Sequence, residues 1–354
     1  MITFVTYFDR NFLARGLALI DSLARTATMP WRIIVLALDE TVADTLASFR
    51  CDRQLAPDQV AAVGVGDLIA VYPELGALAA ARDRTDFYFT LTPYVCSFVL
   101  SKAKAGDRFA YLDADLYFFG DPAPLFQSED APVAIVEHRF PPRLAHLAER
   151  FGRFNVGFIG FTKAQAADDC VARWLDQCRE WCRDVPEPGR YADQGYLDAW
   201  PATVPGLEII DHPGANLAPW NLERHRLRSG PDGRVTVDGA PLIFFHFHRL
   251  RRRDRALYDA EYHGYGAIGD VTRTAIYPPY LAALDRLEKA YVASSADTGR
   301  LHRLERPLRS RFRNGLSTFL AVLRLFTRER VLFRQAAPLS PWRALGQLLA
   351  SRSP

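Results

Sequence analysis

Two aspartates that interrupt an apolar run, Asp113 and Asp115, are the residues of this chain whose spacing points most directly to chemistry. The run reads Tyr-Leu-Asp-Ala-Asp-Leu-Tyr-Phe-Phe from residue 111 to residue 119. Because burying charge is costly unless the charge is paired or bound to a metal, the pair predicts a bound cation. A hard divalent cation on carboxylates is the usual partner of a diphosphate. We therefore expect a metal site that handles a phosphorylated substrate.

A second pair of candidate ligands, His246 and His248, lies in the apolar segment 244–248. Alternate residues of a strand share one face, so the two imidazoles are expected to point together. Imidazole is a common ligand for transition metals such as manganese, and two carboxylates with one imidazole make half of an octahedral shell. The alternative is a core strand whose histidines hydrogen-bond locally, as buried polar groups usually do.

Two further segments place amide and carboxyl groups beside apolar runs. Asn155 begins the run 155–161, whose glycines permit a ligand or backbone to approach closely. Its amide is either a sugar-binding group or part of a turn. Asp193 and Gln194 fall at the start of a short helix expected at 192–200, where Asp193 is either an N-cap or a group facing a sugar.

The elements that must position these residues follow from the hydrophobic pattern. Strands alternate with helices over the first 120 residues, which predicts βαβ units and an α/β fold with a parallel sheet. Strands are expected at 1–7, 31–38, 65–71, 109–112, 116–119, 133–137, 155–161, 207–210 and 241–248, and helices at 13–23, 41–50, 90–104, 164–184, 192–200 and 279–292. The Asp pair then falls at the carboxyl end of a strand, where open α/β sheets bind ligands.

The charge of the chain is unevenly distributed, although its net charge is only +3. Residues 300–354 contain 12 Arg, no Lys and 2 Glu. We therefore predict a domain at 1–270 and a helical, Arg-rich extension at 271–354. Leucine and phenylalanine between the arginines of 303–330 predict an interfacial helix on anionic lipid. The alternative is a helix packed on the domain with a basic outer face.

Cysteine usage and hydropathy suggest a location. The five cysteines form no CxxC pair, which favours a reducing compartment. No run of 18 uncharged apolar residues predicts a spanning helix. We expect a cytoplasmic protein, peripheral on the inner face of the membrane, with no nucleic-acid partner. Cys178 and Cys182, at helical spacing with Trp174 and Trp181, are expected in the core.

In their order, these segments make residues 1 to about 265 resemble a retaining GT-A glycosyltransferase of glycosyltransferase family 8, which includes glycogenin and bacterial lipo-oligosaccharide galactosyltransferases. The segments are Thr6-Tyr7-Phe8-Asp9, Leu112-Asp113-Ala114-Asp115, Phe154-Asn155-Val156-Gly157, Ala192-Asp193-Gln194-Gly195 and His246-Phe247-His248. The resemblance implies a GT-A mixed sheet flanked by helices. It also implies sugar transfer from a nucleotide diphosphate sugar, a UDP-sugar, to a glycan or lipid-linked acceptor, as in lipopolysaccharide biosynthesis.

The resemblance further implies roles for single residues. Asp113 and Asp115, with Ala114 between them, would hold Mn²⁺ or Mg²⁺ on the diphosphate. His246 would be the third protein ligand, with His248 as the competing candidate. The remaining roles are a nucleoside pocket of Thr6, Tyr7 and Asp9, a donor-sugar site of Asn155, Asp193 and Gln194, and an acceptor region at 214–221. There Trp220 would stack on a sugar or anchor a loop.

One departure from the family concerns an arginine in the helix before the Asp pair. The predicted helix contains none over 90–96, and Arg82 and Arg84 lie upstream of it. This departure predicts a divergent branch and leaves the donor sugar open.

The same residues bear on mechanism and on rival functions. No carboxylate is identified as a nucleophile and Gln194 is a poor one, so we expect front-face attack through an oxocarbenium-like transition state. A nucleotidyltransferase would need a Gly-rich basic loop after the first strand, which residues 8–12 do not supply. The other rival is a weak or inactive GT-A-like scaffold tethered through its basic tail.

Overall fold

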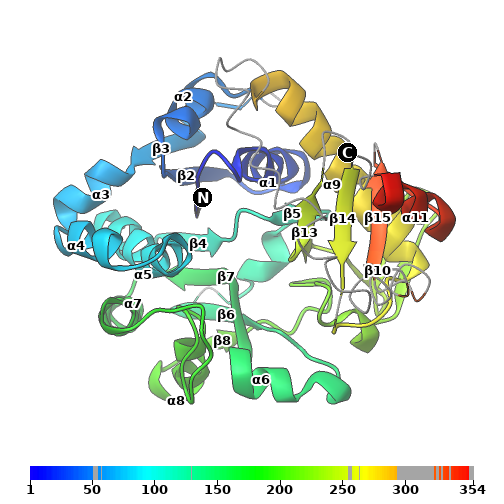
Figure 1. The fold of residues 1–354 in the computed structure, drawn as a ribbon. Helices are drawn as coiled ribbons and strands as arrows, with labels where there is room; N and C mark the ends of the chain where they lie inside the picture. Colours follow the sequence, from blue (N-terminus) through cyan, green and yellow to red (C-terminus); the bar gives the residue numbers. More distant parts are fainter. Residues whose placement is uncertain are drawn as a thin grey trace.

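A seven-stranded mixed sheet lies at the centre of the molecule (Figure 1). The computed structural model describes residues 1–50, 55–56, 58–128, 130–253, 257–262, 264–292, 323, 327, 330–334 and 336–350. In sheet order the strands are β3 (Val60–Gly64), β2 (Trp31–Ala37), β1 (Ile2–Phe8), β4 (Arg108–Leu112), β7 (Phe154–Thr162), β6 (Val133–Glu137) and β8 (Glu208–Ile209). Only β7 runs antiparallel to its neighbours in this sheet. The predicted α/β class, with a mixed sheet flanked by helices, is confirmed.

Helices cover both faces of the sheet because its strands are apolar on both sides. In β1, Phe4 belongs to the core shared with α1 and α9, and the next residue, Val5, to the core shared with α5 and α7 (Figure 1). Burial on both faces is typical of parallel strands. The helices are α1 (Leu13–Thr26), α2 (Glu40–Ser48), α3 (Val65–Val71), α4 (Glu74–Ala81), α5 (Arg84–Lys102), α6 (His146–Phe151), α7 (Gln165–Glu180), α8 (Trp200–Thr203), α9 (Tyr277–Leu287) and α11 (Pro341–Ala350).

Three smaller sheets lie beside the central one. They are the pair β5 (Leu116–Phe118) and β12 (Phe244–His246), the sheet of β9 (Leu227–Ser229), β10 (Val235–Val237) and β11 (Ala240–Pro241), and the sheet of β13 (Leu250–Arg252), β14 (Leu257–Glu261), β15 (Arg330–Arg334) and β16 (Ala337–Pro338). The β5–β12 pair joins two segments more than 120 residues apart in the chain, and this pairing builds the site described below.

The helical extension expected at 271–354 also contains two strands, β15 and β16. The strand β15 pairs with β14 from Leu257↔Arg334 to Glu261↔Arg330, and Phe333 is fully buried against Tyr277 with ring centroids 5.0 Å apart. An apolar run of Val-Leu-Phe favours this strand. The helix expected at 279–292 is present as α9, and most of the range 303–330, where an interfacial helix is expected, lies outside the described residues. The domain boundary at 270 stays a prediction.

Two further elements differ from those expected. Residues 65–71 form the helix α3 and the strand β3 precedes it, because a short apolar run fits either structure and the Asp67 carboxylate accepts the Gly64 N–H at 2.9 Å. The helix expected to begin at residue 90 begins at Arg84, since Asp83 caps it by accepting the Thr85 and Asp86 N–H groups. This earlier start brings Arg84 into the helix before the Asp pair.

The cysteines and the hydropathy of the helices bear on the expected location. Cys96, Cys170, Cys178 and Cys182 are buried and free of disulfides. Cys178 and Cys182 pack with Trp174 in the core shared with α5 and α7, as expected. Within the described ranges, every helix is too short or too polar to cross a membrane.

Candidate functional site

A cavity of about 730 Å³ opens where β1, β2 and β4 end. Of the residues that the sequence singled out, Tyr7, Asp9, Asp113, Ala114, Asp115, Asn155, Asp193, Gln194, Trp220, His246 and His248 line it. Thr6 does not line the cavity. Successive side chains of a strand point to opposite faces, and Thr6 is fully buried on the face away from Tyr7.

Asp113, Asp115 and His246 form the one cluster among the described residues that can hold a metal ion with three protein ligands. Their ligand atoms lie within 4.8 Å of one another. His246 Nε2 is 3.1 Å from Asp115 Oδ1 and 3.7 Å from Asp113 Oδ2. The pairing of β12 with β5 sets His246 opposite Leu116, the residue that follows Asp115. Strand pairing therefore brings together the two segments that the sequence left separate.

The charges of this cluster are strongly coupled. Burial opposes ionisation of Asp115, but the charge and hydrogen bond of His246 outweigh it and lower the pKa of Asp115 to about 2. For Asp113, burial raises the pKa by more than the charge of His246 lowers it, and the carboxylate of Asp115 raises it further. Burial also opposes the charged form of His246, yet Asp115 and Asp113 raise its pKa. The side chains of Asp113 and Asp115 keep 30% and 20% of their surface exposed, so a cation in the cavity can reach them.

The competing ligand His248 lies beyond the end of β12 and outside the metal cluster. Its ring packs edge-on against Trp220 at 5.3 Å, and its Nε2 is 3.5 Å from the hydroxyl of Tyr265. Burial lowers the pKa of His248 to about 3, which the charge of His246 reinforces. Of the two histidines, His246 has the geometry of a ligand.

Asn155 and Gln194 are bonded to each other and to the surrounding backbone. Asn155 Nδ2 donates to Gln194 Oε1 at 2.9 Å, and Gln194 Nε2 donates to the Phe151 carbonyl at 2.7 Å. Asn155 Oδ1 lies 3.3 Å from His246 Nδ1. Both side chains are over 90% buried. In this structure the two amides are held by these hydrogen bonds, and their contact with a donor sugar stays a prediction.

Asp193 lies in a strained loop at the cavity wall. The preceding Ala192 has φ 46°, a conformation that costs energy for a residue with a Cβ. Burial raises the pKa of Asp193 to about 7. The hydrogen bond from Thr92 opposes this rise only in part, and the charge of Asp113 increases it. The expected helix at 192–200 is a 3-10 helix, Gly195–Ala199, followed by α8, so Asp193 is not its N-cap.

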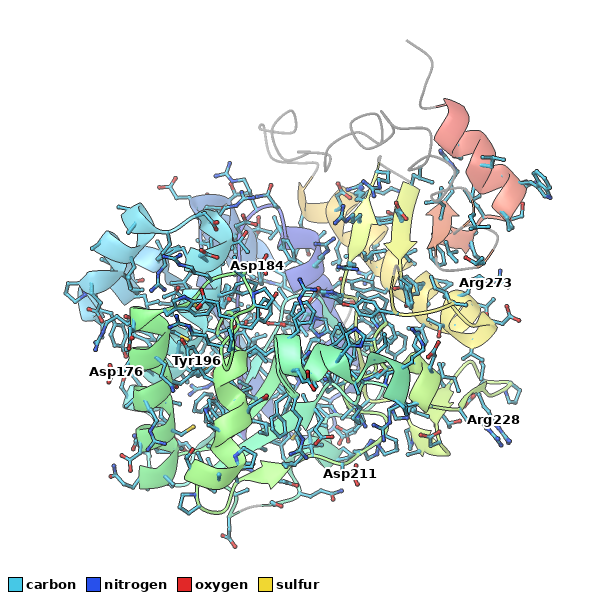
Figure 2. All side chains as sticks on the ribbon, turned by 60° about the horizontal axis from the view of Figure 1, so that its bottom comes forward. Asp176, Asp184, Tyr196, Asp211, Arg228 and Arg273 are labelled. Carbon is cyan, nitrogen blue, oxygen red and sulfur yellow. The ribbon has the colours of Figure 1, made fainter. Side chains whose placement is uncertain are left out.

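Side chains on both sides of Asp193 fix this loop. The Tyr191 hydroxyl donates to Asp184 Oδ1 at 2.7 Å, and the Tyr196 hydroxyl donates to the Trp181 carbonyl at 2.7 Å (Asp184 and Tyr196 are labelled in Figure 2). The indole N–H of Trp174 donates to the Asp193 carbonyl at 2.7 Å. The Asp193 carboxyl is thus held at the cavity wall by a rigid loop.

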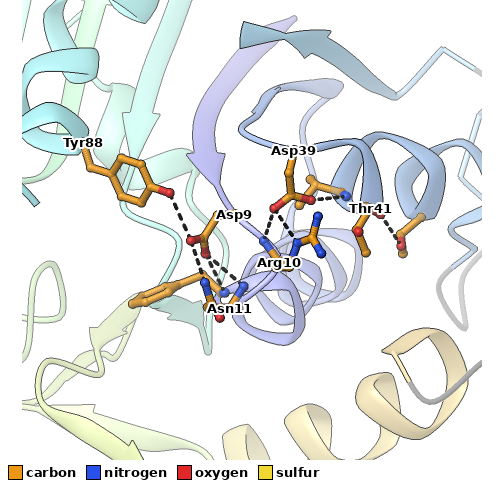
Figure 3. A network of polar contacts seen from close by, with 9 residues as sticks. Asp9, Arg10, Asn11, Asp39, Thr41 and Tyr88 are labelled. Carbon is orange, nitrogen blue, oxygen red and sulfur yellow. Dashed lines mark hydrogen bonds and ion pairs between the residues drawn. The ribbon is translucent and has the colours of Figure 1, made fainter. Parts of the chain in front are cut away.

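Asp9 organises the turn after β1. Its carboxylate accepts the N–H groups of Asn11 and Phe12, the Asn11 amide and, at 3.0 Å, the hydroxyl of Tyr88 (Figure 3). Asp39 caps α2 beside it and accepts the Arg10 N–H at 2.8 Å. With four donors, Asp9 holds Tyr88 and the start of α1 at one end of the cavity, where a nucleoside was expected.

Arg84, at the first turn of α5, lines the cavity beside Thr85 and Tyr88. It is exposed, and its charge lowers the pKa of Tyr88, which burial and then the charge of Asp9 raise. Arg82, in contrast, donates to the carbonyls of Cys178 and Arg179. The capping pattern Asp-Arg-Thr-Asp at 83–86 was the sequence signal that extends the helix to Arg84.

Residues 214–221 support β12 and contribute to the cavity wall. The Leu217 carbonyl accepts the His246 N–H at 2.8 Å. Trp220 is 4% exposed, because the rings of His138, His246 and His248 surround it at 5.1 to 5.3 Å. Of the two alternatives for Trp220, this burial favours the loop anchor over a sugar-stacking platform.

Two proteins of Bacillus subtilis (strain 168) are similar to this chain in sequence. The uncharacterized protein YfnF is 32% identical over 256 residues, which cover 70% of this chain and 81% of YfnF. The uncharacterized protein YfnD is 34% identical over 217 residues, 60% of this chain and 69% of YfnD. No family model matches the chain.

Solved glycosyltransferases are similar to the chain in structure. The galactosyltransferase LgtC, in complex with donor and acceptor sugar analogues, matches 70% of this chain and 90% of its own, with 18% identity and a TM-score of 0.46. Mouse xyloside xylosyltransferase 1 matches 70% of this chain and 98% of its own, with 14% identity and a TM-score of 0.45.

Proposed function

We propose that this chain, which belongs to the family of the Bacillus subtilis proteins YfnD and YfnF, is a metal-dependent glycosyltransferase of the GT-A type. It would move a sugar, with retention, from a nucleotide diphosphate sugar, expected to be a UDP-sugar, to a glycan or lipid-linked acceptor. The observation that carries the proposal is the cluster of Asp113, Asp115 and His246 in a cavity of about 730 Å³.

The donor set fits a divalent cation. Two carboxylate oxygens and one imidazole nitrogen converge within 4.8 Å, and the carboxylates are open to the cavity. Oxygen-rich sets with one imidazole suit Mn²⁺ and also accept Mg²⁺. When bound, the cation supplies Lewis-acid stabilisation of charge on the departing diphosphate. The chain's own contribution is to fix the three ligands before the substrate arrives.

Other cavity residues would bind and orient the donor. Tyr7, Tyr88 and the turn held by Asp9 would take the nucleoside, and Arg84 would meet the diphosphate or the sugar. Asp193 is a buried carboxyl in the cavity wall, suited to stabilising positive charge that develops on the sugar ring. With no second carboxylate assigned as a nucleophile, front-face attack is the mechanism that we infer.

Hydrolysis of a panel of UDP-sugars and other nucleotide sugars, with and without Mn²⁺, tests the proposal. We expect slow, metal-dependent release of the nucleotide diphosphate with at least one donor. Release of pyrophosphate from a nucleoside triphosphate and a sugar phosphate would instead support the nucleotidyltransferase alternative. Absence of turnover with every donor would favour the scaffold.

Replacement of Arg84 by Gln is expected to raise the KM for the nucleotide sugar by about 10-fold or more. A charge-assisted hydrogen bond to a phosphate is worth about 1.5–3 kcal/mol. Steady-state kinetics at saturating Mn²⁺ measure this effect. The matched control is Arg179→Gln, which removes an exposed arginine paired with Asp176 outside the cavity. An unchanged KM would show that Arg84 does not contact the donor.

An aromatic and basic mouth is suited to the acceptor. Phe151 and Tyr191 pack with ring centroids 5.0 Å apart, and the guanidinium of Arg249 lies over Tyr265 at 5.3 Å. All four line the cavity. Aromatic faces and arginine are favourable surfaces for sugar rings and their anionic groups. We therefore assign the acceptor to this mouth rather than to Trp220.

A peripheral membrane location through residues 303–330 remains part of the proposal, although only residues 323, 327 and 330 of this range are described. Deleting the tail is a poor test, because β15 contributes buried Leu332 and Phe333 to the fold. Neutralising Arg303, Arg306, Arg309, Arg311 and Arg313 to Gln removes charge alone.

At about 1 kcal/mol per arginine near an anionic surface, the five-fold Gln variant is expected to bind vesicles of phosphatidylcholine and phosphatidylglycerol at least about 100-fold more weakly. Flotation with these vesicles measures the difference in binding, and vesicles of pure phosphatidylcholine serve as the uncharged control. Equal binding by both proteins would favour a tail helix packed on the domain.

A further inference from the structure

The strand β7 is distorted at the point where it passes next to the metal cluster. Its register with β6 shifts, so that Ile135 pairs with Ile159 but the next residue, Val136, pairs with Asn155. Residues 156–158 therefore have no partner in β6. On the other side β7 stays in register with β4 up to Leu112↔Phe158, and the Asp113 N–H donates to the Gly157 carbonyl at 3.0 Å. Such bulges re-aim side chains next to active sites.

The bulge directs Asn155 at the metal ligand His246. Asn155 Oδ1 lies 3.3 Å from His246 Nδ1, and it also accepts the Gly157 N–H at 3.2 Å. A backbone N–H can only donate, so this bond fixes which end of the amide is the oxygen. His246 Nδ1 must then carry a proton, so Nε2, 3.1 Å from Asp115 and 3.7 Å from Asp113, is the nitrogen left to bind a cation.

Gln194 holds Asn155 in this orientation. Its Oε1 accepts from Asn155 Nδ2 at 2.9 Å and from the Val156 N–H at 3.3 Å, and its Nε2 donates to the Phe151 carbonyl at 2.7 Å. Two backbone groups of fixed polarity thus determine the orientation of this second amide as well. The direction of every hydrogen bond from Phe151 to His246 is therefore specified.

Gly157 is required by the closeness of these groups. A Cβ at this position would lie 2.6 Å from Asn155 Oδ1 and 2.8 Å from His246 Nδ1. Its backbone meanwhile ties both ligand segments together, since its N–H donates to Asn155 and its carbonyl accepts from Asp113. Because Gly157 has no side chain, the bulge can contact the segments that carry the metal ligands directly.

We propose that Asn155 and Gln194 are positioning residues of the metal site: the β7 bulge uses Asn155 to fix the tautomer and orientation of His246, and Gln194 locks Asn155. This inference rests on the proposed function for the identity of the metal. It replaces the role implied by family resemblance, in which both amides contact the donor sugar. Outer partners of metal-binding histidines typically change metal affinity by about 10- to 100-fold.

Mn²⁺ binding to the full chain without nucleotide sugar, measured by calorimetry, tests the inference apart from catalysis. Asn155→Leu removes the oxygen at similar volume and is expected to weaken Mn²⁺ binding by about 10- to 100-fold. Asn155→Asp keeps the acceptor for His246 but loses the donor to Gln194 Oε1, and is expected to weaken Mn²⁺ binding less than Asn155→Leu does. Gly157→Ala separates the same groups without deleting either, and is expected to weaken binding like Asn155→Leu.

The outcomes separate the inference from the proposed function. Unchanged Mn²⁺ affinity in Asn155→Leu, or equal weakening in the Leu and Asp variants, would overturn the positioning role. A raised donor KM with unchanged Mn²⁺ affinity would restore direct sugar contact. If the unaltered chain itself does not bind Mn²⁺, the metal assignment of the proposed function fails instead.

A measurement on the unaltered protein covers the case in which no variant folds. In the Zn²⁺-loaded chain, ¹⁵N chemical shifts of His246 are expected to report a protonated Nδ1 and a metal-bound Nε2. The opposite assignment would overturn the inference, because Asn155 Oδ1 would then face a nitrogen without a proton.

Discussion

Replacement of Asp115 by Asn is expected to lower metal-dependent turnover of the nucleotide sugar by about 1,000-fold. A bound cation contributes several kcal/mol of charge stabilisation, and each 1.36 kcal/mol is a factor of ten in rate. Asp115 is the carboxylate nearest to His246, at 3.1 Å, so its loss removes a ligand and leaves His246 without its principal counter-charge. Values of kcat/KM at several Mn²⁺ concentrations measure the effect.

The matched control for Asp115→Asn is Asp232→Asn, the same chemical change in the exposed turn between β9 and β10. This variant is expected to keep the activity of the unaltered protein. Turnover that persists in Asp115→Asn, with the metal dependence unchanged, would mean that the cluster is not the metal site of the reaction. Thermal unfolding of both variants separates loss of activity from loss of fold.

Replacement of Asp193 by Asn is expected to abolish most activity and yet to stabilise the metal-free protein at alkaline pH. Burial raises the pKa of Asp193 to about 7 from its ordinary value of 3.8. The folded state therefore binds this proton more tightly than the unfolded state. The stability associated with the neutral carboxyl is fully present below about pH 4 and is lost as the pH rises through 7.

At 1.36 kcal/mol per pKa unit, the charged carboxyl costs a few kcal/mol at pH 8, and the neutral amide of Asn avoids this cost. Urea unfolding in the presence of EDTA should therefore show Asp193→Asn more stable than the unaltered chain at pH 8, with the difference vanishing near pH 4. EDTA is needed because a cation beside Asp113 would favour ionised Asp193. A difference that is independent of pH would contradict the assignment.

The pH profile of kcat should show a decrease on the acid side that is due to Asp193. If the charged carboxylate stabilises positive charge on the sugar, kcat falls as the pH drops below the pKa of Asp193 in the substrate complex. That pKa is expected below 7, since the bound cation offsets the charge of Asp113. This decrease should be absent from the residual activity of Asp193→Asn, and its persistence there would assign it to another group.

Much of the fold and part of the site follow from local sequence patterns. The strands β1, β2, β4 and β6 and the helix α1 are apolar runs between turn residues, and each was expected within a few residues of its observed bounds. The position of Asp113 and Asp115 at the end of β4 follows from the same pattern. The hydrophobic pattern does not determine the element at 65–71, where one apolar run fits either a helix or a strand. It also does not determine the start of α5, which the capping residue Asp83 sets.

Contacts between distant segments had to come from the tertiary structure. The sequence alone determined the α/β class, the Asp pair at a strand end and the imidazoles able to complete a metal site. The tertiary structure decided which imidazole does so, because the pairing of β5 with β12 places His246, and not His248, beside Asp115. It also turned Asn155 and Gln194 inward. A bulge depends on how β7 meets β4 and β6 together, and the pattern of a single strand does not contain that information.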